Sequence, residues 1–131
     1  KVMPVYGALT LIVTLSSMGL PGLNGFVGEF TILLGAFGSE AIGSRWFSGL
    51  AAVGVILAAI YMLYMFQKLF LGPLDKEENR SLKDLNLREI LTLAPLLIFI
   101  FWIGIYPAPF FNLMAPAVDK LVAVLQAAAI P

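Results

Sequence analysis

Long uncharged stretches dominate the chain. Three of them carry no charged side chain, at residues 2–28, 46–67 and 90–118. Each is long enough to cross a hydrocarbon layer of ~30 Å, which takes about 20 helical residues. Because they lack the period-2 alternation of strands, they are read as helices. The pattern predicts an all-α polytopic membrane protein in one membrane region, residues 1–131, with three transmembrane helices at about 4–37, 46–70 and 90–114.

The first predicted helix is too long for a single straight span. Residues 4–37 would extend for about 50 Å at 1.5 Å per residue. The excess is explained by a cluster of helix-breaking residues at 20–25, "LPGLNG". Proline removes a helical hydrogen bond, and glycine tolerates backbone angles that other residues avoid. We therefore predict a discontinuous helix, broken at Pro21, Gly22, Asn24 and Gly25, with Asn24 able to cap the second half.

Such a break restricts where the helix can lie. Unwound backbone at membrane depth is stable only where protein or a water-filled cavity satisfies its polar groups. We therefore expect the broken helix to pack inside a bundle rather than against lipid.

The charged connections predict the orientation. The first connection has one acid and one base, Glu40 and Arg45, whereas the second, with its flanks, has five basic residues: Lys68, Lys76, Arg80, Lys83 and Arg88. Because basic loops stay in the cytoplasm, loop 72–88 is predicted to be cytoplasmic. Lys1 is then also cytoplasmic, and the C-terminus lies outside. The segment that follows Pro109 is short for a span, so we expect it to lie along the interface or cap the bundle.

Composition narrows the class further. The chain is 60% hydrophobic and 12% charged, with a mean hydropathy of +0.95, whereas soluble domains are about 25% charged. A net charge of zero gives no reason to expect a nucleic-acid partner. The chain has no cysteine and no histidine. It therefore lacks the residues that usually bind iron–sulfur clusters, haem and zinc, and the histidine of a Ser-His-Asp triad. We expect no metal and no cofactor in this chain, and no catalytic redox site.

The beginning of the chain is also informative. The sequence begins at Lys1 without a methionine, and residues 2–28 are uncharged over a far longer stretch than the apolar part of a cleaved signal peptide. We therefore expect the sequence to be a piece of a longer polypeptide.

Glu29 is the residue most suggestive of function. It is the only charged residue between Lys1 and Glu40, and it lies about 9 residues, or about 13 Å, from the outer end of its helix. A charged group at mid-membrane costs about 2.5–3.5 kcal/mol on insertion scales, and by default indicates a functional site. We predict that Glu29 takes up and releases a proton. The alternative is a structural glutamate that hydrogen-bonds the loosened backbone of the break.

Other polar side chains along the spans are weaker candidates. Lys68 is a tentative site for proton exchange with the cytoplasm, although a lysine near the surface usually extends to the headgroups. Ser17 and Thr14 are tentative relay residues. The first span contains five serine and threonine hydroxyls that either hold a water chain or bond back to their own helix carbonyls, which is the commoner outcome: Thr10, Thr14, Ser16, Ser17 and Thr31.

These residues resemble a known family. "GLPGLNGFVGEF" at 19–30 is similar to the broken twelfth helix of the antiporter-like membrane subunits of NADH-quinone oxidoreductase (respiratory complex I), and "MFQKLFLG" at 65–72 is similar to the helix that follows. Within that family, Glu29 favours the chain M branch, because the sister chains L and N typically carry a lysine there. The resemblance covers essentially the whole chain, as the last three of the family's fourteen helices.

The resemblance implies a role in proton translocation. Quinone reduction would occur in partner subunits, where NADH, FMN, iron–sulfur clusters and quinone are expected, and Glu29 would be the terminal site of a hydrophilic axis through the membrane. The partners implied are the other membrane subunits of complex I, including the sister antiporter-like chains, and the lipid bilayer. The location implied is the bacterial inner (plasma) membrane.

Two alternatives stay open. The chain can instead be a subunit of a multi-subunit sodium/proton antiporter or of a membrane-bound hydrogenase, which share the helix break. It can also be a purely structural membrane subunit. An independent enzyme is disfavoured, because the sequence offers no catalytic constellation.

Overall fold

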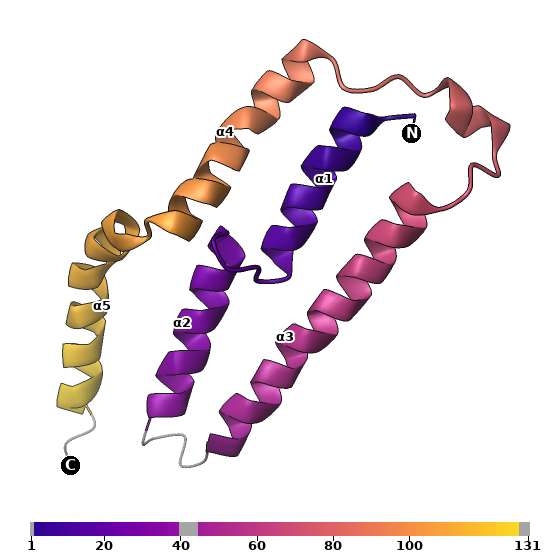
Figure 1. Cartoon of the computed structure of the whole chain (residues 1–131). Coiled ribbons are helices and arrows are strands. Elements are labelled where there is room, and N and C mark those ends of the chain that lie inside the picture. Colours follow the sequence, from indigo (N-terminus) through magenta and orange to yellow (C-terminus); the bar gives the residue numbers. More distant parts are fainter. Residues whose placement is uncertain (1, 40–44, 129–131) are drawn as a thin grey trace.

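The chain is built from helices that lie beside one another (Figure 1). The computed structural model describes residues 2–39 and 45–128, and this part contains helices and no strand. Its α-helices are α1 (Pro4–Ser17), α2 (Asn24–Gly38), α3 (Arg45–Phe66), α4 (Leu87–Ile105) and α5 (Ala108–Ala128). The prediction of an all-α fold is therefore confirmed. Lys1 and Glu40, which entered the prediction of orientation, lie outside the described residues.

The predicted break divides the first long helix into α1 and α2, which follow one another with an irregular segment at 18–23 between them (Figure 1). The two halves are 14 and 15 residues long, so neither is long enough to cross a membrane alone. The break lies two residues earlier than predicted, because Asn24 and Gly25 already belong to α2. The proposed cap is wrong: Leu23 is the N-cap residue, and its side chain makes no capping hydrogen bond.

The second span agrees with its prediction. Helix α3 continues into a five-residue π-helix, η1 (Gln67–Leu71), and together they form an apolar helix of 27 residues. It lies alongside both α1 and α2. The following loop is exposed as far as Lys83 and contains a short 3-10 helix, η2 (Glu77–Ser81).

The third span differs from its prediction. Helix α4 begins with a capping box, in which Asn86 accepts from the Glu89 backbone N–H and the Glu89 carboxylate accepts from that of Asn86. It ends at Ile105, nine residues short of the predicted position 114. Tyr106 leaves the helical region because it precedes Pro107, and a residue before proline is disfavoured in the α conformation.

The C-terminal segment is longer than predicted. After Pro107, α5 forms a helix of 21 residues that is long and apolar enough to cross a membrane, as are Arg45–Leu71 and Leu87–Ile105. The prediction of a short interfacial segment is therefore wrong about its length. Its placement relative to a membrane stays a prediction.

The best-packed part of the structure surrounds the break. Among the described residues, the buried side chains are Thr14, Ser16, Met18, Leu23 and Ser48. All but Ser48 belong to the end of α1 or to the break. Elsewhere large apolar side chains are exposed along the helices, for example 81% for Leu113 and 83% for Trp46. Apolar exposure on this scale indicates surroundings of lipid or further protein.

Helix α4 packs directly on the break. A Cβ atom added at Gly104, in the last turn of α4, would overlap the carbonyl group of Gly22 and the Cα of Leu23. Since backbone meets backbone there, nothing flexible can move aside. Glycine at position 104 therefore allows α4 to lie against the broken helix.

We predict that Gly104→Ala weakens this packing and lowers the free energy of unfolding by about 1–3 kcal/mol, the usual cost of overpacking. Gly54→Ala in α3 is the matched control, because open space surrounds a Cβ at Gly54. The control should be neutral or stabilised by up to about 1 kcal/mol, since alanine is the better helix former. Thermal unfolding in detergent measures both variants. Equal melting temperatures would contradict the proposed contact.

Candidate functional site

The end of α1 is closed by a Schellman motif. Gly19 adopts a left-handed conformation, with φ of 73°. Its N–H donates to the Ser16 carbonyl at 3.1 Å, and the Leu20 N–H donates to the Leu15 carbonyl at 3.1 Å. This pair of bonds satisfies helix-end carbonyl groups that would otherwise lack partners at membrane depth.

A tight turn follows the Schellman motif at once. The Leu23 N–H donates to the Leu20 carbonyl at 3.1 Å, which closes a four-residue turn. Pro21 occupies its second position, and Gly22 occupies its third with φ of 92°. Proline followed by a glycine with positive φ is typical of a type II turn. The interruption is thus a built structure in which each glycine has a specific conformation.

The two half-helices contact each other across the break. The Ser16 hydroxyl donates to the Asn24 side-chain oxygen, joining the last turn of α1 to the first residue of α2. A Cβ added at Gly25 would overlap the Ser16 carbonyl. Gly25 is therefore needed for close approach, and not for unwound geometry as predicted.

The Glu29 carboxyl group lies against the break. Glu29 is in α2, six positions after the N-cap residue Leu23, and its side chain is half-buried. A Cβ added at Gly19 would overlap the Glu29 Oε2 atom. Helical side chains point back toward the N-terminus, which explains how Glu29 reaches a residue before its own helix.

This position puts the carboxyl group between two helix ends of opposite polarity. Gly19 directly follows the C-terminal end of α1, where the helix dipole is negative, and α2 begins nearby with its positive end. The N-cap of α2 offers no side-chain acceptor to the first-turn N–H groups. The site therefore combines one ionisable group with backbone polar groups at a helix interruption.

The hydroxyl groups of α1 divide between the break and the surface. Thr14 is 2% exposed and Ser16 is 5% exposed, whereas Ser17 is exposed. The structure therefore brings Ser16 to the break instead of the predicted relay candidate Ser17. Thr10 and Thr31 bond back to carbonyls one helical turn earlier, at 2.8 Å and 2.6 Å, which confirms the commoner reading for these two.

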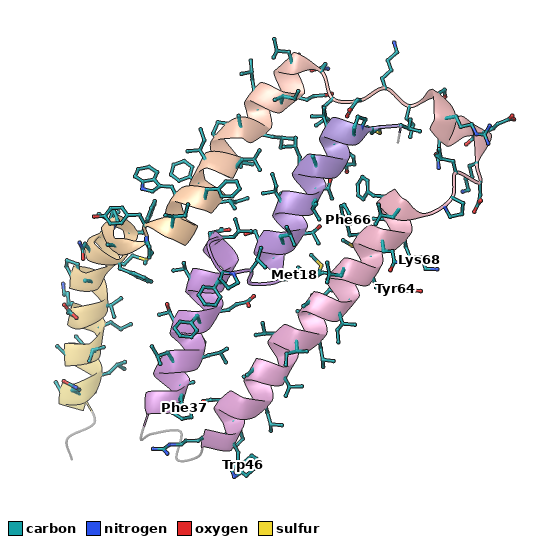
Figure 2. The ribbon with its side chains drawn as sticks, viewed as in Figure 1. Met18, Phe37, Trp46, Tyr64, Phe66 and Lys68 are labelled. Atoms are coloured by element: carbon teal, nitrogen blue, oxygen red, sulfur yellow. The ribbon has the colours of Figure 1, made fainter. Side chains whose placement is uncertain are left out.

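Lys68 is not brought to this site. It lies in η1 with its ammonium group 5.4 Å from the centre of the Tyr64 ring, a cation–π contact, and it is exposed. Figure 2 shows Lys68 and Tyr64 on the side of α3 that faces away from α1, whereas the Met18 side chain extends from the break toward α3. Lys68 therefore lies on the face of α3 away from the break, and its predicted role in proton exchange stays a prediction.

Three residues at structurally important positions were missed by the sequence reasoning. For Gly19 a signal exists, since a glycine followed two residues later by proline is typical of a helix C-terminus. Gly104 is an ordinary helix glycine in sequence, and only packing reveals its role. Asp84 accepts hydrogen bonds from Val5 and Tyr6, which lie nearly 80 positions earlier in the chain, and the sequence carries no local signal for such a contact. Within residues 2–39 and 45–128, no group of three acidic, histidine or cysteine side chains could hold a metal ion.

Known proteins that this chain is similar to are described as subunits or chains of NADH oxidoreductases. Residues 1–57 match a family described as "NADH:quinone oxidoreductase/Mrp antiporter, TM". The chain is 39% identical over 119 residues to NADH-quinone oxidoreductase subunit M of Rickettsia bellii, which covers 91% of this chain. It is 37% identical over 120 residues to NADH-ubiquinone oxidoreductase chain 4 of Marchantia polymorpha, and 38% identical over 120 residues to subunit M of Rhodobacter capsulatus, each covering 92% of it.

These matches confirm the resemblance to the antiporter-like subunits. The chain spans 23% of the length of each of these relatives. Both the broken helix and the start of α3 lie within the region that the family match covers.

We predict that Gly19→Ala destabilises the protein more than Gly22→Ala. Both positions have positive φ, at a cost of about 1–2 kcal/mol for a residue with a Cβ, but only at Gly19 would the new methyl group overlap the Glu29 carboxyl group. Adding Glu29→Ala should relieve that overlap. A double-mutant cycle on unfolding free energies should therefore give a coupling of about 0.5–3 kcal/mol. A coupling of zero would show that Glu29 does not lie against Gly19.

Proposed function

We propose that this chain, which resembles subunit M and chain 4 of the NADH oxidoreductases along 119 or more of its residues, forms part of a proton-translocating membrane subunit of NADH:quinone oxidoreductase. Glu29 is its intramembrane proton site. The observation that carries this assignment is the Glu29 carboxyl group at the break, beside Gly19. By the family resemblance, redox chemistry is carried out in other subunits of the assembly.

The surroundings of Glu29 suit a group that changes its protonation. Its carboxyl group lies between the negative end of α1 and the positive end of α2, and these two fields oppose each other. A change in a neighbouring charge then decides whether the acid or the carboxylate is the more stable form. By the family resemblance, lysines elsewhere in the assembly supply that charge.

Proton transfer to Glu29 needs polar groups or water on either side. The Ser16 hydroxyl and the uncapped N–H groups at the start of α2 are hydrogen-bonding groups at the break. Thr14 lies two residues before Ser16 in α1 and is also buried. We propose Thr14 and Ser16 as the relay on the α1 side. Ser17 is less suitable because its side chain faces outward.

The proposed membrane arrangement follows the charged loop. Loop 72–88 faces the cytoplasm, and α1 begins on that side because its first turn contacts Asp84. Glu29 then exchanges protons toward the outer face or toward a neighbouring antiporter-like subunit. The location proposed is the bacterial inner membrane, with the membrane subunits of complex I as partners.

A second candidate function is that of a subunit in a multi-subunit sodium/proton antiporter. The description of the matching family includes Mrp antiporters, and that match covers the break and Glu29. The longer alignments over 119 and 120 residues are to NADH oxidoreductase subunits, and they favour the first proposal.

Replacing Glu29 by glutamine tests the proton site. Glutamine keeps the size and hydrogen bonding of the side chain but cannot release a proton, so transfer through this site should slow by about a hundredfold. Proton pumping per NADH oxidised, measured in membrane vesicles, should fall while the complex still assembles. Glu29→Asp retains an acid and should recover part of the pumping.

Asp119→Asn is the control, because it removes an exposed carboxylate from the apolar helix α5. Its pumping should equal that of the unmodified complex. Loss of the whole complex in Glu29→Gln, with no selective loss of pumping, would instead support the structural role of Glu29. Unchanged pumping would refute the proposal.

A further inference from the structure

Asp84, in the loop between η2 and α4, closes the first turn of α1. Its Oδ2 atom accepts from the Val5 N–H at 2.7 Å, and its Oδ1 atom accepts from the Tyr6 N–H at 3.0 Å. Oδ1 also accepts from the Leu85 N–H at 2.8 Å. One half-buried carboxylate therefore binds three backbone N–H groups, two of them nearly 80 residues away in sequence.

Helix α1 has no cap of its own. Its N-cap residue Met3 makes no side-chain capping bond, and Pro4 at the first position has no N–H. The next two residues, Val5 and Tyr6, therefore have N–H groups that need an acceptor from outside the helix. Asp84 supplies it, with a negative charge placed at the positive end of the helix dipole.

The other end of the same loop also contacts this turn. Phe70 in η1 packs on Gly7, where an added Cβ would be 3.3 Å from the Phe70 ring, and its ring centroid is 5.7 Å from that of Tyr6. Phe70 in turn stacks on Phe66 at 4.9 Å. The first turn of α1 is thus held from both ends of the loop that joins α3 to α4 (Figure 1).

From these contacts we infer that Asp84 is a positioning residue for the break: by fixing the first turn of α1, it sets where the last turn of α1 lies relative to Glu29. Helix α1 is about 21 Å long and has no internal proline after Pro4, so it transmits a displacement as a rod. Its far end contacts α2 through Ser16 and ends at Gly19, against the Glu29 carboxyl group. The consequence for proton transfer rests on the proposed function of Glu29.

The charge state of Asp84 fits this role. Desolvation raises the pKa of its carboxyl group, but the N–H groups of Val5, Tyr6 and Leu85 together lower the pKa by more than desolvation raises it. The pKa therefore lies below its usual value. A lowered pKa means that the stabilisation is complete above about pH 4, the unfolded value, and is lost only as the pH falls through the folded pKa. The cap is therefore intact throughout the neutral range.

Hydrogen exchange in the intact complex tests the inference, with Asp84→Ala as the first variant. Loss of a helix cap should speed exchange of the Val5 and Tyr6 amides by about tenfold. If Asp84 positions the break, the Gly19 and Leu20 amides, whose bonds form the Schellman motif, should also exchange faster, and proton pumping per NADH oxidised should fall.

Two further variants sharpen the test. Asp84→Asn keeps one acceptor oxygen but turns an amino group toward the Val5 N–H or the Tyr6 N–H, so its effects should be intermediate. If the Asp84→Ala complex does not assemble, the same measurements on Asp84→Asn test the inference. Asp75→Asn removes a carboxylate from the same exposed loop and should change none of these readouts.

The outcomes separate the two claims. Faster exchange at Val5 and Tyr6 with no change at Gly19 and Leu20 would make Asp84 a local cap only, and would overturn the inference. Unchanged exchange at Val5 and Tyr6 would overturn it as well. If Glu29→Gln leaves pumping intact, the proposed function fails, and exchange at Gly19 and Leu20 still decides whether Asp84 positions the break.

Discussion

The structure depends on satisfying backbone hydrogen bonds where a membrane helix is interrupted. In a hydrocarbon environment each unpaired N–H or C=O group costs several kcal/mol, so a helix can break only where the chain or its neighbours supply partners. Here the partners come from the chain itself. The Schellman bonds at Gly19 and Leu20 close α1, and the turn from Leu20 to Leu23 leads directly into α2.

Packing around this interruption explains the rest of the arrangement. Met18 and Leu23 are the buried apolar side chains of the described residues, and both lie in the break. Helix α4 meets the break backbone to backbone at Gly104, and α3 lies along the other side of α2. A second glycine, Gly19, leaves room for the Glu29 carboxyl group on the same break. The packing of α4 and the candidate site therefore both depend on the short segment between α1 and α2.

Much of this arrangement could be predicted from particular residues. The apolar stretches located α3 and the start of α4, and the Pro21–Gly22 pair located the interruption, because proline and a glycine of positive φ are required by the turn found there. Glu29 stood out because it is a lone charge in an apolar stretch, and it does lie at the break. These features depend on residues that are close together in the sequence, so a local sequence pattern is enough to predict them.

What could not be predicted depends on contacts between distant segments. Asn24 has the residue type of a helix cap, yet its side chain bonds to Ser16 across the break. Ser16 and Ser17 are adjacent and chemically alike, and only the rotation of α1 against α2 decides which hydroxyl is buried. The length of α5 was underestimated because its first residues were assigned to the preceding span, predicted to end at 114. The helix in fact begins at Ala108, since it tolerates Pro109 in its first turn and, at some cost, Pro116 further along.

Infrared difference spectroscopy on the energised complex tests the central claim most directly, because it detects protonation of an individual carboxyl group. The account predicts a carboxylic C=O stretching band that appears and disappears during turnover, shifts when glutamate is isotopically labelled, and is lost in Glu29→Gln. A difference spectrum that is identical with and without the Glu29 carboxyl group would contradict it, since Glu29 would then keep one protonation state throughout.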